Sequence, residues 1–123
     1  MNARQRKAFE KISNNIDAWR QIEALGWGKT FDYEAIAEKL SEDPETKKRL
    51  SIFVGCAVRL LMELAPFPRF CSDDQLDDIC SHIVGLGRIE FLRAVADPKK
   101  ALLEHADTTE ESFSYCFLGP EDE

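Results

Sequence analysis

Four aspartates stand close together in the second half of the chain. Asp73, Asp74 and Asp77 form an Asp-Asp-x-x-Asp pattern, and Asp78 follows directly. Carboxylates on adjacent helical turns can bind one hard cation such as Mg²⁺. These aspartates are therefore the first candidate for chemistry in this sequence.

The aspartates can also be accounted for without a metal ion. Enzymes of isoprenoid diphosphates use this pattern inside large helical bundles, usually with a second acidic motif, and a chain of 123 residues offers neither. In the first turn of a helix, Asp73 and Asp74 would interact favourably with the helix dipole. Like charges four residues apart still cost about 0.2–0.5 kcal/mol per pair. Water, an internal cation such as Arg69 or Arg88, or a basic partner would compensate them.

The positions of the cysteines and histidines do not predict a zinc site or a catalytic site. The four cysteines are Cys56, Cys71, Cys80 and Cys116. Their spacing matches neither paired C-x-x-C motifs nor a dense disulfide framework, and three of them have the surroundings of small buried residues. Cys80 and His82 are two residues apart, so on a helix they point in different directions. His105 is expected at the surface or its boundary.

Two further motifs suggest phosphate binding, but their context argues against it. Gly85-Leu86-Gly87-Arg88 follows a predicted helix rather than a strand, which favours a helix end and a turn over a phosphate loop. The basic residues near the N-terminus belong to an acidic chain without a recognisable DNA-reading helix. We therefore predict no catalytic residue, no cofactor, no metal and no nucleic acid.

The charge is unevenly distributed. The net charge is −7, with 11 basic and 9 acidic residues in 1–60 against 5 and 14 in 61–123. An acidic half repels nucleic acid and favours a basic protein surface as partner. Halves of opposite sign also permit self-association into a homo-oligomer.

No segment has the length of a membrane span. The most apolar run, 50–64, has 15 residues and includes Arg59 and Glu63, whereas a span needs about 20 apolar residues. The basic residues at the N-terminus are not followed by the apolar stretch of a secretory signal. We expect a cytoplasmic protein that does not associate with membranes.

Apolar residues recurring every three or four positions predict an all-α fold, a compact single-domain bundle of six to seven helices over residues 1–119. The tail 120–123 is expected to fray. The first helix is predicted over 3–25, ended by Gly26, and the second begins at Thr30 or Asp32. A central helix near 44–64 is apolar almost all round and opens with an Asp-Pro signal.

The second half continues the same pattern. Ser72 and Gln75 form a capping box for a fourth helix that ends at Gly85-Leu86-Gly87, and a fifth helix follows. Asp97-Pro98 opens a sixth, and a last helix begins at Asp107 and ends near residue 119.

This region also resembles a known family. The residues concerned are Cys71-Ser72-Asp73-Asp74, the stretch from Ile83 to Arg88, Phe91 and Ala96-Asp97-Pro98. Their order and spacing over about residues 71–98 are similar to those of an uncharacterised bacterial family, the domain of unknown function 4240. The resemblance implies an α-helical fold and no mechanism.

Without a nucleophile, a metal cage or a phosphate cradle, the sequence favours a non-enzymatic protein-binding module. We expect a small acidic inhibitor of the immunity type or a phage-encoded antagonist. The alternatives are a magnesium-dependent enzyme that uses the aspartate cluster, or an acidic mimic of DNA. The predicted partner-binding residues are Asp73, Asp74, Asp77 and Asp78. Trp27, Phe67 and Phe70, on predicted loops beside charged residues, are candidate apolar anchors, although each suits the core better.

Overall fold

The regular structure of the chain is helical. The computed structural model describes residues 1–30, 32–65, 73–106 and 113–117, and for Thr30, Asp73, Ser114 and Tyr115 it describes the backbone alone. The elements are α1 (Ala3–Ser13), α2 (Ile16–Ala24), α3 (Trp27–Thr30), α4 (Tyr33–Ser41), α5 (Pro44–Leu64), α6 (Asp73–Leu86), α7 (Arg88–Ala96), α8 (Pro98–Glu104) and the 3₁₀ helix η1 (Phe113–Phe117). The predicted all-α bundle around a central apolar helix is confirmed.

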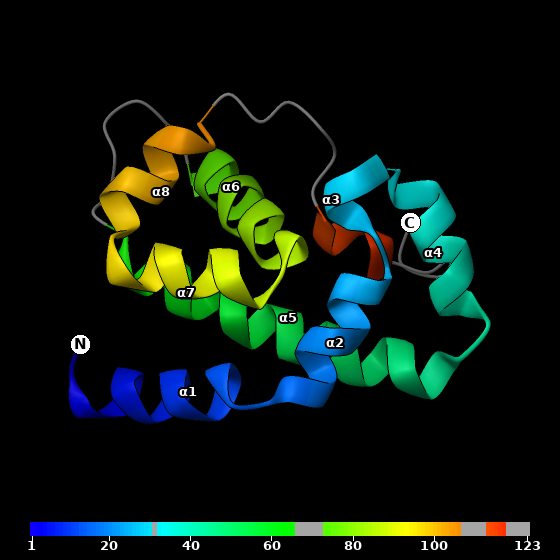
Figure 1. Ribbon diagram of the computed structural model, residues 1–123, viewed down its shortest axis with the longest axis horizontal. Coiled ribbons are helices and arrows are strands. Elements are labelled where there is room, and N and C mark those ends of the chain that lie inside the picture. Colours follow the sequence, from blue (N-terminus) through cyan, green and yellow to red (C-terminus); the bar gives the residue numbers. More distant parts are fainter. Residues whose placement is uncertain (31, 66–72, 107–112, 118–123) are drawn as a thin grey trace.

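The central helix is α5, which crosses the whole molecule (Figure 1). It begins as predicted, because the Asp43 side chain accepts a hydrogen bond from the backbone N–H of Thr46 at 3.2 Å and Pro44 occupies the first helical position. Helix α1 runs antiparallel to α5, since Arg4 near its start pairs with Glu63 near the end of α5 at 2.8 Å. Helices α6, α7 and α8 gather over the C-terminal half of α5, and α4 packs near its start.

The predicted first helix is wrong in one respect, because it is divided into α1 and α2. Asn14 ends the first segment and Asn15 caps the second, with the Asn15 side-chain oxygen accepting from the Ala18 N–H at 3.2 Å. An asparagine side chain that bonds to a nearby backbone N–H in this way competes with the hydrogen bonds of a continuous helix. The indole N–H of Trp19 donates to the carbonyl of Ile12 at 2.9 Å, so a buried acceptor near the end of α1 is satisfied.

Trp19 is also the centre of the aromatic core. Its ring lies 5.1 Å from those of Phe53 and Phe91, and Phe91 in turn stacks on Phe9 at 6.3 Å. Trp19 and Phe91 are almost completely buried. These contacts join α1, α2, α5 and α7 and hold one side of α5 in place.

Glycine and aspartate set several helix boundaries. Gly26 has φ +79 after α2, and Asp32, not Thr30, caps α4. The predicted break at Gly85-Leu86-Gly87 is wrong at its first residue, because Gly85 lies inside α6. Only Gly87, with φ +118, separates α6 from α7.

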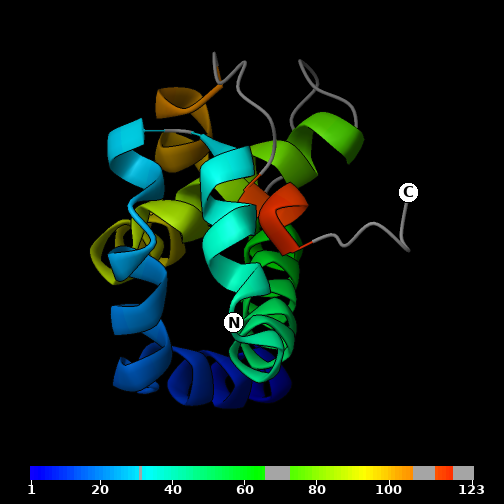
Figure 2. The same ribbon diagram turned by 90° about the vertical axis from the view of Figure 1, so that its right-hand side faces the viewer.

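The last described element is a 3₁₀ helix rather than the predicted α-helix. Phe113, Cys116 and Phe117 are buried in η1 as the apolar pattern suggested, against α4 and α6 (Figure 2). The predicted starts at Ser72 and at Asp107, and the tail, lie outside the described residues. Among the described helices none has the length and apolar character to cross a membrane.

Candidate functional site

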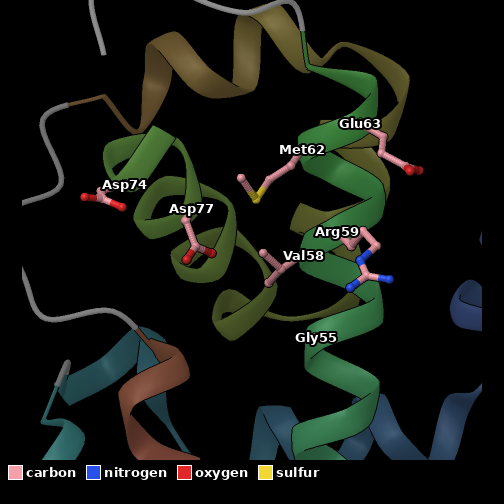
Figure 3. Close-up of a pocket in the computed structure, with 7 residues that line it drawn as sticks. All are labelled: Gly55, Val58, Arg59, Met62, Glu63, Asp74 and Asp77. Atoms are coloured by element: carbon pink, nitrogen blue, oxygen red, sulfur yellow. The ribbon is translucent and has the colours of Figure 1, made fainter. Parts of the chain in front are cut away.

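An open groove of about 610 Å³ lies between α5 and α6 (Figure 3). Helix α5 contributes Gly55, Val58, Arg59, Met62 and Glu63, and α6 contributes Asp74 and Asp77. Val58 and Met62 point from α5 toward α6 and give the groove an apolar floor. Gly55 widens it, because a Cβ added there would meet nothing within 4 Å.

The acidic wall of the groove consists of Asp74 and Asp77, which are one helical turn apart on α6. Both side chains are exposed enough to meet a ligand. Partial burial raises the pKa of the Asp77 carboxyl above its usual value, and the neighbouring Asp74 charge raises it further. The described residues therefore do not neutralise the negative charge of this pair.

The basic residue of the opposite wall does not remove this imbalance. No ion pair of Arg59 occurs within the described part of the chain, and Arg59 does not lower the pKa of Asp77. Glu63 points to the other side of α5 (Figure 3), where the hydrogen bond from Arg4 lowers its pKa. The groove therefore combines an apolar floor with an acidic wall.

The structure brings together only part of the predicted aspartate cluster. Asp74 and Asp77 share the groove, whereas Asp78 is half-buried and has an interaction of its own. Asp73 is the first residue of α6, and its side chain lies outside the described part of the structure. Of the two arginines considered as internal compensation, Arg88 instead donates from Nε to the carbonyl of Ser13 at 2.8 Å, and Arg69 is not described.

Trp27, a candidate anchor that suited the core better, is buried in the free protein. It lies in α3 rather than in a loop, and only 1% of it is exposed. Its ring packs 5.5 Å from that of Phe113, and its indole N–H donates to Nδ1 of His82 at 3.1 Å. Trp27 is therefore a core residue. Phe67 and Phe70 lie outside the described residues.

The described residues hold no group of three or more His, Cys, Asp or Glu side chains placed to bind one metal ion. The cysteines there are free: Cys80 and Cys116 are buried, and Cys56 is exposed. Burial raises the pKa of the Cys116 thiol to about 12, so this thiol is not a nucleophile at neutral pH.

Sequence reasoning missed the α5 side of the groove. Gly55, Val58 and Met62 recur at intervals of three and four residues, which places them on one face of α5. That spacing was the available signal, but the same face would serve equally well in the core. Only the position of α6 beside it shows that the face borders an open groove.

Neither the family models, nor the curated proteins, nor the solved structures contain a match to this chain. The resemblance of residues 71–98 to the domain of unknown function 4240 stays a prediction, and the groove must be interpreted from its own chemistry.

Proposed function

We propose that this chain is a non-enzymatic protein-binding module that binds a basic partner through the groove between α5 and α6. Within that class it would act as a small acidic inhibitor, of the immunity type or as a phage-encoded antagonist. The partner would present a lysine or arginine to Asp74 and Asp77. The stem of such a side chain can lie on apolar residues while its charged end stays near carboxylates.

One observation carries the proposal: the partly buried Asp77 stands beside Asp74 on the wall of an open groove. A second carboxylate here costs stability, and none of the described residues lowers the pKa of Asp77 in return. Perturbed carboxyl groups in clefts are typical of functional sites. A basic partner would supply the missing charge and would speed association through complementary fields.

The apolar floor gives the partner a second requirement. Val58 is buried, and Met62 is partly exposed in the groove. A flexible methionine adapts to different apolar shapes. The proposal therefore favours a partner segment that carries an apolar residue beside its basic one, which a simple polycation lacks.

The test is a quantitative capture experiment from the native host, with the captured protein identified and then purified for binding measurements. The test variant is Asp74→Asn/Asp77→Asn, and the control is Glu38→Gln, which removes charge from an exposed site on α4. We expect one partner to bind wild type and Glu38→Gln alike, to bind the double variant at least about tenfold more weakly, and to weaken with salt. Equal affinity of all three proteins would refute the groove as the binding site.

A further inference from the structure

Three polar rings and one carboxylate connect four helical segments toward the C-terminal end of α6. The indole N–H of Trp27 in α3 donates to Nδ1 of His82 in α6 at 3.1 Å. The ring of His105, which follows α8, lies 5.4 Å from that of His82. Nε2 of His105 lies 3.8 Å from a carboxylate oxygen of Glu90 in α7.

The contact with Trp27 fixes the protonation state of His82. An indole N–H can only donate, so Nδ1 of His82 must carry a lone pair. His82 is therefore neutral in this arrangement, with its proton on Nε2. A second proton on the ring would occupy Nδ1 and break the hydrogen bond. Because His82 is only 6% exposed, water does not readily replace that contact.

His105 has the opposite preference. Its Nε2 faces the carboxylate of Glu90, so a proton on His105 creates an ion pair. The carboxylate of Glu90 also accepts a hydrogen bond from Nη1 of Arg93 at 3.1 Å. A cationic His105 would then repel a second proton on the neighbouring His82 ring.

The other elements packed on α6 bring no further histidine to this place. Helix α2 places Glu23 against Gly87, one residue beyond the end of α6. Helix α5 lines the groove with Arg59 and turns Glu63 to its other side, toward Arg4 (Figure 3). Phe113 of η1 contributes an uncharged ring against Trp27. Of the titratable groups described here, His105 meets the ring of His82, and the carboxylate of Glu90 meets His105.

We propose that the Trp27–His82–His105–Glu90 chain makes the attachment of α3 and η1 to α6 proton-sensitive. A second proton on the His82 ring releases the Trp27 indole and loosens the packing of Trp27 on Phe113. The contact lies toward the C-terminal end of α6, whereas the proposed binding groove lies at its start, so the proton-sensitive attachment does not depend on the groove.

The test is an NMR titration of the full chain, which contains two tryptophans and two histidines. Trp19 is the internal control, because its indole donates to the backbone carbonyl of Ile12, which does not titrate. The pH is lowered from about 8 through the ordinary histidine range near 6.5 and below it. At lower pH the Trp27 indole N–H signal should shift and lose its protection from exchange in one step, while the Trp19 signal stays.

Two variants test whether the change in the Trp27 signal depends on the histidines. His82→Gln keeps an acceptor for Trp27 and cannot titrate, so the Trp27 step should disappear. His105→Gln removes the repelling charge, so the step should move to higher pH. A Trp27 signal that follows the Trp19 signal throughout, or a step unchanged in either variant, would overturn the inference. Where His82→Gln does not fold, the ¹⁵N signals of the wild-type imidazole at about pH 8 decide, since a protonated Nδ1 contradicts the proposed state.

Discussion

Substitution of glycine by alanine should have opposite effects on the stability of the protein at two interior helix positions. In α6, a Cβ added at Gly85 would lie 2.6 Å from Cδ1 of Trp27 and 2.7 Å from Cγ of Phe113. Both are ring atoms of fully buried side chains, so they cannot simply swing away. In α5, a Cβ added at Gly55 would meet nothing within 4 Å.

The expected magnitudes follow from two terms. Alanine is better than glycine in a helix interior by about 0.5–1 kcal/mol. Forcing an extra methyl group into a packed core costs about 1–3 kcal/mol. Gly85→Ala should therefore lower the free energy of unfolding by about 1–2 kcal/mol, whereas Gly55→Ala should raise it by about 0.5–1 kcal/mol. The melting temperature should move by about 3–5 °C per kcal/mol in a domain of this size.

Urea unfolding followed by tryptophan fluorescence measures both values on one scale, with the slope m checking that the unfolded states are comparable. Gly55→Ala is the matched control, because it changes the same atoms without the clash. If Gly85→Ala proved as stable as wild type, the close packing of Trp27 and Phe113 on α6 would be refuted. If both variants gained stability, helix propensity alone would determine the effect of the substitution, and the clash at Gly85 would be absent.

Two further predictions concern the acidic wall. Asp77→Asn should stabilise the protein by about 0.2–0.5 kcal/mol near neutral pH, because it removes a like charge one turn from Asp74. Because the pKa of Asp77 is raised in the folded state, the folded chain binds more protons than the unfolded chain. The loss of stability caused by the Asp77 charge therefore appears as pH rises through the folded pKa, and it vanishes below the unfolded pKa near 3.9. The free energies of unfolding of the two proteins, measured in urea, should therefore become equal at about pH 3. Millimolar Mg²⁺ should leave the melting temperatures of wild type and Asp74→Ala unchanged, and a rise in wild type alone would favour the metal-dependent alternative.

Local signals in the sequence predicted the elements well. Asp43-Pro44 and Asp97-Pro98 each begin a helix where expected, because an aspartate cap and a proline at the first position act within one turn. The error at Asn14-Asn15 has the opposite cause. The apolar stripe of Trp19 and Ile22 continues that of Ile12, so periodicity alone does not show the break.

Residues whose surroundings come from distant segments could not be predicted. Trp27 was expected in a loop beside charged residues, yet its hydrogen-bond partner lies 55 positions away on α6. A tryptophan between two glycines carries no local sign of which helix will cover it. The same limit applies to the α5 face of the groove, whose residues have the spacing of a core face and become a floor only because α6 begins beside them.

The polar residues at the two ends of α6 differ in their exposure to water. The charge of Asp77 lies near water, so it lowers the stability of the fold only slightly, and a basic partner can offset this small penalty on binding. His82 is buried, so its polar atoms must be satisfied within the fold, and Trp27 satisfies one of them. A change at Asp77 should therefore act mainly on recognition, whereas a change at His82 should act on the packing of α3 and η1. Measuring binding and unfolding for both sets of variants separates these two roles, because the groove and the Trp27 contact lie at different ends of α6.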